Sequence, residues 1–202
     1  MQRKRAQVRR VEILEATVEQ IQSGGMAALR ISDVATALGI SAALVVYHFD
    51  SKENLLAAAL RHAAERDLLK LHRIVKPSSP ASHRLMEALR WYVPTGQARG
   101  WIIWIDGWAE ALWNKEIAAV LTDLQAQWTQ IIAALVDEGT ASGEFDAVDG
   151  HAAATRITAL LDGLAVRILV HDRRLSRRVL TDWLTQHVAW ELGADADALA
   201  DA

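Results

Sequence analysis

The sequence of 202 residues contains no cysteine, only three prolines and no apolar run long enough to cross a membrane. The absence of cysteine excludes disulfide scaffolds, cysteine-based zinc sites and catalytic thiols. The most apolar stretch, residues 157–170, is interrupted by Asp162 and Arg167, so we expect no membrane span. The N-terminus lacks the apolar segment of a signal peptide, so we expect a cytoplasmic protein that binds no membrane.

Motifs of catalysis and metal binding are also missing from the sequence. It has no Gly-x-Ser-x-Gly, no glycine-rich phosphate loop, and no pair of histidines at the i,i+4 spacing of zinc proteases. Carboxylate pairs such as Asp137 and Glu138 fall at the expected ends of helices, where water solvates them. We therefore predict that the protein is not an enzyme and holds no metal and no cofactor.

Helix-forming residues, by contrast, are abundant. Alanine and leucine dominate the intervals between short clusters of Gly, Pro, Ser and Asp, and few intervals alternate as strands do. These intervals predict an all-α fold of about nine helices, at residues 3–23, 31–38, 42–48, 52–75, 81–92, 97–113, 115–140, 148–171 and 175–192. The tail at 193–202, rich in Ala and Asp, is expected to fray.

Two short helices that cross steeply are predicted on either side of Gly39. Val34 and Val45 are spaced to point inward, and Gly39 ends the first helix where a left-handed residue is needed. Ser41 is placed to cap the second helix. This spacing is that of a helix-turn-helix, whose second helix enters the DNA major groove. An ordinary helical corner is the alternative interpretation.

The residues around this pair make the pattern more specific. The sequence here resembles the TetR family of bacterial transcriptional regulators over residues 8–56. The resemblance is carried by Val34-Ala35, Leu38-Gly39-Ile40-Ser41, Tyr47-His48-Phe49 and Lys52-Glu53-Asn54-Leu55. The C-terminal part is similar to the choline/betaine-repressor type within that family, in the segments 108–112, 138–145 and 160–164.

The resemblance implies a DNA-binding domain of three helices at residues 1–51 and an effector-binding and dimerisation domain at 52–202. It implies a ligand-responsive DNA-binding regulator. The principal hypothesis is a repressor that a small-molecule effector releases from a palindromic operator. The effector would shift the population of two states through the long helix at 52–75. The alternative is a helical small-molecule-binding protein whose helix-turn-helix is vestigial.

Candidate DNA contacts lie on the second helix of the pair and beside it. They are Ser41, Ala42, Ala43, Leu44, Tyr47, His48 and Lys52, together with Arg3 and Arg5 of the basic N-terminus. The alanines and the leucine offer base edges only apolar contact, whereas Ser41, Tyr47 and Lys52 suit phosphates. The net charge is −3, yet residues 3–10 carry five positive charges and no negative one. This basic arm either tracks phosphates or a minor groove, or forms a solvated tail.

Two positions depart from the family's pattern. Arg30 stands where the family often has Thr or Ser to cap the first helix of the pair. We expect Ser32 to cap instead, which would shorten that helix by a turn. Val46 stands where the family often has a Tyr that donates to phosphate, so we expect one hydroxyl contact, from Tyr47, rather than two.

The sequence holds eight tryptophans, several of them at helical spacing. Trp101, Trp104, Trp108 and Leu112 are three and four residues apart and are expected to share one face of a helix. Such a stripe is typical of a core; the alternative is the wall of an effector pocket, suited to a flat apolar molecule or a quaternary ammonium cation. The candidate pocket residues are His62, Trp91, Trp101, Trp104, Trp108, Trp128 and Asp162.

The last two expected helices are apolar over broad faces, which predicts either burial within one subunit or a homodimer interface. We favour the homodimer, because a helix-turn-helix that binds palindromic DNA needs two copies about 34–36 Å apart. Two such helices and their symmetry mates would form a four-helix bundle. The candidate interface residues are Ile157, Leu161, Leu164, Ile168, Leu180, Trp183 and Leu184. The expected partners are thus a double-stranded DNA operator, an aromatic or cationic small-molecule effector, and a second copy.

Overall fold

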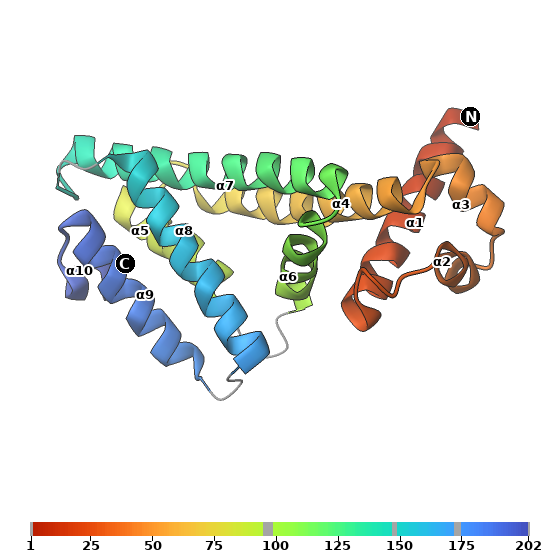
Figure 1. The fold of residues 1–202 in the computed structure, drawn as a ribbon. Coiled ribbons are helices and arrows are strands. Elements are labelled where there is room, and N and C mark those ends of the chain that lie inside the picture. Colours follow the sequence, from red (N-terminus) through yellow and green to blue (C-terminus); the bar gives the residue numbers. More distant parts are fainter. Residues whose placement is uncertain (1, 95–98, 147–148, 172–174, 202) are drawn as a thin grey trace. The chain divides into compact units, whose positions relative to one another are not determined.

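The computed structural model describes residues 2–94, 99–146, 149–171 and 175–201, with side chains from Ala6 onward except that of Arg99. This part of the chain contains ten α-helices, one π-helical turn and no strand, which confirms the all-α prediction (Figure 1). The elements are α1 (Gln2–Gly24), α2 (Ile31–Leu38), α3 (Ala42–Phe49), α4 (Lys52–Ile74), α5 (Ala81–Tyr92), α6 (Arg99–Ala111), α7 (Lys115–Ser142), α8 (Gly150–Val166), η1 (Arg167–His171), α9 (Arg177–Leu192) and α10 (Ala196–Asp201).

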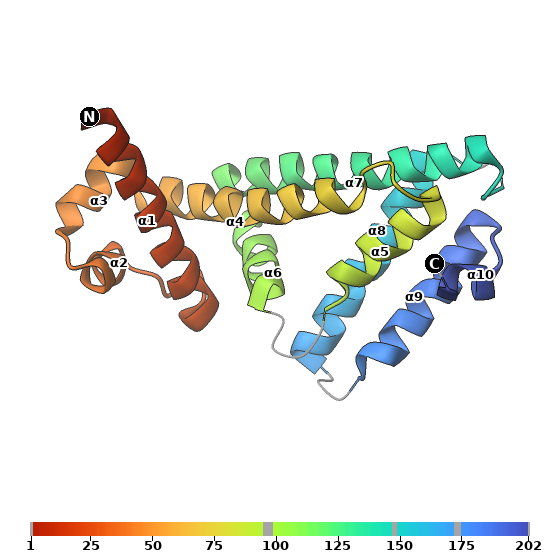
Figure 2. The same ribbon diagram turned by 180° about the vertical axis from the view of Figure 1, so that it is seen from behind.

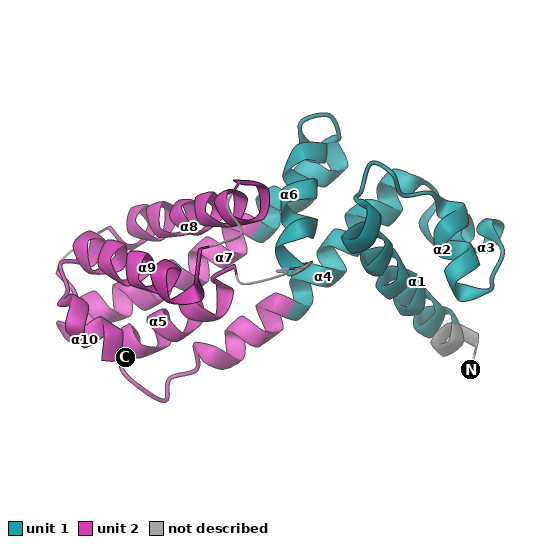
Figure 3. Ribbon diagram, turned by 90° about the horizontal axis from the view of Figure 1, so that it is seen from below, with its two compact units in different colours: residues 1–66, 99–124 teal, residues 67–98, 125–202 magenta. Residues whose placement is uncertain are grey.

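Two compact units make up the chain, and Figure 3 colours them separately. Unit 1 comprises residues 1–66 and 99–124 and contains α1 to α3, α6, and parts of α4 and α7. Unit 2 comprises residues 67–98 and 125–202 and contains α5, α8 to α10, and the remainder of α4 and α7. Residue 51, the predicted domain boundary, lies between α3 and α4, whereas unit 1 continues to residue 66 and includes α6.

In unit 1, α2 and α3 are bent by 114° relative to each other, as in a helix-turn-helix. Val34 and Val45 are fully buried between them. Gly39 has a φ of 63° and ends α2, and the Ser41 hydroxyl caps α3 by accepting the Leu44 N–H at 3.2 Å. The local rules for a C-terminal glycine and an N-terminal serine therefore produced the predicted pair.

The expectation that Ser32 caps α2 was wrong. The helix begins at Ile31, directly after Arg30, and has no side-chain cap. The Asp33 N–H already donates to the Arg30 carbonyl at 3.0 Å, which closes the first turn upstream of Ser32. The helix therefore keeps its full length without a hydroxyl at its start.

Six of the seven residues predicted for a dimer interface are buried within the single chain. They are Ile157, Leu161, Leu164, Ile168, Leu180 and Leu184, each at most 5% exposed. In unit 2, α8 packs against α9, so their broad apolar faces are covered without a second copy. Within the single chain these six side chains therefore offer at most 5% of their surface to a second copy. Trp183 differs, because 41% of its surface is exposed.

The prediction that the tail frays was also wrong. Gly193, with a φ of 61°, ends α9, and α10 then packs against α9 and α5 (Figure 2). Leu199 is only 2% exposed, and the Arg90 guanidinium donates to the carbonyl oxygens of Leu199 and Ala200 at 2.6 and 2.9 Å. One buried leucine and one arginine thus fix a segment whose composition is typical of a disordered end.

None of the described helices has by itself the length and apolar character needed to cross a membrane, although α2 and α3 taken together reach that limit by length and composition. Among the described residues, no group of three or more His, Asp or Glu side chains is placed to hold a metal ion.

Candidate nucleic-acid interface and aromatic clusters

The solvent-facing side of α3 is small and largely apolar at its beginning. Ala42 and Ala43 are exposed and Leu44 is half-buried, while Tyr47, one turn later, is 78% exposed. Phe49 is buried and anchors the end of the helix. This face can contact base edges only through apolar groups, and the Tyr47 hydroxyl is free to donate to a phosphate.

Three other predicted DNA contacts have bonds within unit 1. The Ser41 hydroxyl caps α3, the Lys52 ammonium donates to the Ala27 carbonyl at 3.2 Å, and the His48 carbonyl accepts from Arg10 at 2.6 Å. An ammonium has three donors, so Lys52 can hold Ala27 and still reach a phosphate. Lys52 thus joins the start of α4 to the segment between α1 and α2.

The basic arm is partly engaged by neighbouring side chains. Arg9 pairs with Glu12 at 2.7 Å, and Arg10 binds the end of α3. The side chains of Arg3 and Arg5 lie outside the described residues. Two of the five charges counted for the arm are therefore held within unit 1.

A carboxylate of α6 holds the turn between α1 and α2. Asp106 Oδ2 accepts the Met26 N–H at 3.0 Å, 80 residues away in the sequence. Gly25, just before it, has a φ of 85°, and a Cβ there would lie 3.2 Å from the same oxygen. A glycine is therefore required where α6 approaches the helix-turn-helix.

Unit 1 contains four of the residues predicted for the effector pocket. Trp101 is buried, and its ring centre lies 6.3 Å from that of Trp108, while Trp104 is half-buried. The Nε2 of His62 is buried and has no hydrogen-bond partner among the described residues. Leu112, expected on the same stripe, lies beyond the end of α6 and is exposed. The stripe is therefore one turn shorter than the spacing predicted.

Unit 2 holds the other three, Trp91, Trp128 and Asp162. The two tryptophans belong to a second aromatic group, the α5–α7 cluster, which we define as Trp91, Tyr92 and Trp128. The ring centres of Tyr92 and Trp128 are 4.2 Å apart, and those of Trp91 and Trp128 are 6.4 Å apart. The Lys70 ammonium lies 4.6 Å from the centre of the Trp91 ring, a cation–π contact. The structure thus brings Trp91 and Trp128 together and adds Tyr92.

Carboxylates accompany the α5–α7 cluster. Burial raises the pKa of Asp162, on α8, to about 6. Burial also raises the pKa of Tyr92 well above its usual value, and the negative charges of Asp67 and Asp162 raise it further. The cluster therefore combines aromatic faces with negative charge in a poorly solvated place.

Tyr92 and Asp67 were missed by the sequence reasoning, which considered tryptophans first. A signal for Asp67 exists, because it shares a helix face with the buried residues Ala64, Leu68 and Leu71. For Tyr92 the signal is its position next to Trp91 at the end of an amphipathic helix.

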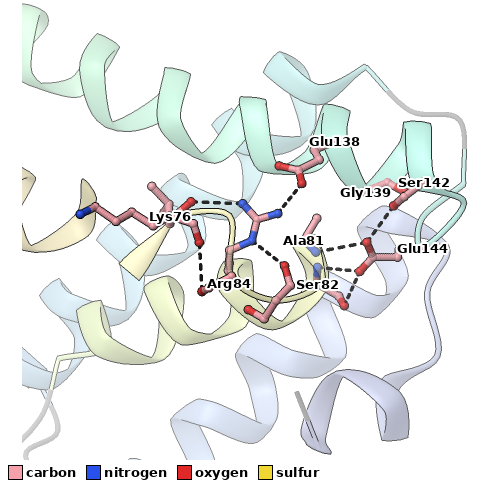
Figure 4. Close-up of polar contacts among 11 residues, drawn as sticks. Lys76, Ala81, Ser82, Arg84, Glu138, Gly139, Ser142 and Glu144 are labelled. Atoms are coloured by element: carbon pink, nitrogen blue, oxygen red, sulfur yellow. Dashed lines mark hydrogen bonds and ion pairs between the residues drawn. The ribbon is translucent and has the colours of Figure 1, made fainter. Parts of the chain in front are cut away.

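A network of polar contacts fixes the start of α5 in unit 2 (Figure 4). The Glu144 carboxylate accepts the backbone N–H groups of Ala81 and Ser82 at 3.1 and 2.9 Å, and the hydroxyls of Ser82 and Ser142 at 2.6 and 2.7 Å. Burial raises the pKa of this carboxyl, but the hydrogen bonds from Ser82, Ser142 and Ala81 outweigh it and lower the pKa to about 2.

Arg84 completes this network from inside α5. It is 2% exposed, donates to the carbonyls of Ser79 and Val75 at 2.9 and 3.1 Å, and pairs with Glu138 of α7. The connection between α4 and α5 is therefore bound to α5 itself. The network positions the helix that carries Trp91 and Tyr92.

Comparisons with known proteins agree with both halves of this description. Residues 13–59 match the family described as bacterial regulatory proteins, tetR family, and residues 81–193 match the family described as BetI-type transcriptional repressor, C-terminal. The chain is 25% identical over 191 residues to the HTH-type transcriptional regulator BetI of Escherichia coli O139:H28, which covers 90% of this chain and 94% of that protein.

Solved structures show the same fold. A protein of Saccharomonospora viridis described as a transcriptional regulator, crystallised in complex with choline, has a TM-score of 0.84 and 30% identity, and the match covers 92% of this chain and 98% of that one. A TetR-family protein of Rhodococcus sp. has a TM-score of 0.79 and 27% identity, over 91% and 98%. The chain belongs to the TetR family of bacterial transcriptional regulators, with a C-terminal region of the BetI repressor type.

Proposed function

We propose that this TetR-family regulator is a repressor whose effector is a small quaternary ammonium cation of the choline class. The observation that carries the proposal is the α5–α7 cluster, in which two tryptophans and a tyrosine lie beside half-buried negative charge. The Saccharomonospora protein, crystallised with choline, supports the same class of ligand.

The chemistry of the cluster fits such a cation. A quaternary ammonium has no N–H group, so hydrogen bonds cannot select it. Each aromatic face attracts it by about 0.5–1 kcal/mol at an exposed site and by about 2 kcal/mol or more when water is excluded. The ionised Asp162 adds a charge of opposite sign, and its raised pKa indicates how poorly water solvates it.

A flat apolar effector bound at the tryptophans of α6 is the second candidate. Trp101 is buried against Trp108, so this stripe packs as a core. The unpartnered His62 Nε2 is the feature that favours a ligand there. The first candidate predicts a positively charged effector, and the second predicts an uncharged one.

The DNA-bound form is proposed to be a homodimer on a palindromic operator in the cytoplasm, where its DNA lies. The apolar surface that remains free on α9 consists of Trp183 and Trp190, which are 41% and 77% exposed. They are seven residues apart and so share one helix face. Light scattering should give a dimer for the wild type and a monomer when both are changed to Glu; a wild-type monomer at micromolar concentration contradicts this proposal.

We propose that the effector releases DNA by binding more tightly to the state whose recognition helices do not match the operator. Exposure of Tyr47 on a complete helix-turn-helix argues against a vestigial one. Substitution of Tyr47 by Ala should weaken binding to all DNA sequences about equally, whereas changes at Ala42 or Ala43 should alter sequence preference.

The effector is tested by calorimetric titration of the wild type with choline and with its uncharged analogue, in which carbon replaces the ammonium nitrogen. Choline should bind at least about tenfold more tightly than the analogue, because only the cation gains from the rings and the carboxylate. Trp91→Leu should remove this preference, and Trp113→Leu, at an exposed tryptophan between α6 and α7, should leave it intact. Equal binding of both molecules, or none, contradicts the proposal.

A further inference from the structure

The C-terminal end of α3 lies beside α1 (Figures 1 and 2), and a side chain of α1 binds it. One guanidinium nitrogen of Arg10 donates to the His48 carbonyl at 2.6 Å. The guanidinium carbon lies 4.2 Å from the centre of the Phe49 ring. A single residue thus makes a hydrogen bond and a cation–π contact to two consecutive residues of the recognition helix.

These contacts meet a specific need of a short helix. The last four carbonyls of any helix lack partners within it, and α3 has only eight residues. A cation near them is favourable because the helix dipole is negative at that end. Phe49 is buried beneath the guanidinium and attaches the end of α3 to the core.

The chain then turns sharply at Asp50. Its φ and ψ are 64° and −46°, and the Ser51 N–H donates to the Phe49 carbonyl at 2.7 Å, which describes a γ-turn with positive φ. Such a strained turn persists only where the surroundings impose it. Arg10 holds the two residues immediately before the turn, so it contributes to that constraint.

We propose that Arg10 is a positioning residue for operator recognition, which sets the orientation of α3 rather than contacting a phosphate. Its guanidinium is committed to His48 and Phe49 in the protein without DNA. Both partners are neutral and leave the charge of Arg10 in place, so we assign its main effect to the orientation of α3 and not to the release of counterions. Losing it should disturb the fit of α3 to base edges and leave the general attraction to DNA intact.

The test compares Arg10→Ala, Arg10→Lys and Arg9→Ala as full-length chains. Arg9→Ala is the matched control. It removes one positive charge from the neighbouring residue, whose side chain pairs with Glu12 and not with α3. The probes are a duplex that the wild-type protein enriches from a random library and a shuffled duplex of the same composition. Binding to both is measured by fluorescence anisotropy over a range of salt concentrations.

Arg10→Ala should weaken binding to the enriched duplex by about tenfold or more, comparable to one mismatched base pair, and should change binding to the shuffled duplex less than about twofold. The slope of log affinity against log salt should stay that of the wild type. Arg10→Lys keeps the charge but lacks the planar guanidinium, so its affinity for the enriched duplex should lie between those of Arg10→Ala and the wild type. Arg9→Ala should bind the enriched duplex within about twofold of the wild type.

The opposite pattern overturns the proposal. If Arg10→Ala weakens both duplexes equally and lowers the salt slope by about one per subunit, Arg10 is a phosphate contact. Full affinity of Arg10→Lys, or no effect of Arg10→Ala, also refutes it. Hydrogen exchange gives a readout without DNA: the amides of residues 46–50 should exchange faster in Arg10→Ala and Arg10→Lys than in Arg9→Ala, and equal rates contradict the positioning role.

Discussion

Replacing Glu144 by Gln tests the polar network at the start of α5. The ionised carboxylate accepts from two backbone N–H groups and two hydroxyls. A glutamine keeps one carbonyl oxygen but turns an amide NH₂ toward groups that are themselves donors. The substitution is nearly isosteric, so any loss of stability reports the charge and its hydrogen bonds.

The pKa of Glu144 gives the size of the effect. A fall from 4.5 to about 2 corresponds to at most about 3.4 kcal/mol, at about 1.36 kcal/mol for each pKa unit. The carboxyl is partly exposed, so screening by water reduces this to about 1–2 kcal/mol. In a chain of this length we expect a drop in Tm of about 2–8 °C.

The loss should depend on pH in a definite direction. The folded-state pKa is depressed, so the stabilisation is complete above the unfolded pKa near 4.5 and is lost as the pH falls toward 2. Urea unfolding of the wild type and of Glu144→Gln should therefore differ at pH 7 and converge by more than half at pH 3. Glu87→Gln, on the exposed side of α5, is the matched control. An equal deficit at both pH values, or none at pH 7, would refute the reasoning.

Three further predictions concern the α5–α7 cluster and the turn after α1. The pKa of Asp162 is about 6, so protonation should weaken choline binding about tenfold between pH 7 and pH 5 by titration calorimetry, and Asp162→Asn should flatten this profile; a flat wild-type profile contradicts the role of its charge. Lys70→Met removes a cation from the face of Trp91 and should tighten choline binding about two- to fivefold, less at high salt; unchanged affinity would show that Lys70 does not compete. Gly25→Ala combines a φ of 85° with a Cβ close to Asp106 and should lower the free energy of unfolding by about 1–2 kcal/mol in urea titrations, which an unchanged midpoint would disprove.

The helix-turn-helix was predictable because its determinants are local. Gly39 and Ser41 each fix a helix end through their own backbone or hydroxyl, and Val34 and Val45 follow a simple spacing. The wrong prediction that Ser32 caps α2 also concerns local structure. A helix can begin without a capping side chain, and here the Arg30 carbonyl accepts the Asp33 N–H and closes the first turn.

The burial of the candidate interface residues and the order of the tail were not predictable in the same way, because burial depends on partners far away in the sequence. An apolar face on α8 can pack equally well against α9 of its own chain or against a second copy. The identity of a residue such as Leu161 does not distinguish these two kinds of contact. Leu199 lies in a segment of Ala and Asp. This segment is held in place by its contacts with α5 and by the hydrogen bond from Arg90 to the Leu199 carbonyl. The grouping of Tyr92 with Trp128 likewise requires α5 and α7 to meet.

The buried guanidinium of Arg84 has a consequence for engineering this chain. Residues 75–80 contain two prolines and two serines and resemble a loop that would tolerate an inserted reporter. Two of the carbonyls there accept from Arg84, which is only 2% exposed, so an insertion would leave this buried charge with its ion pair to Glu138 but without those two hydrogen bonds. Leu112 and Trp113, 75% and 88% exposed between α6 and α7, mark the better position for a fused label.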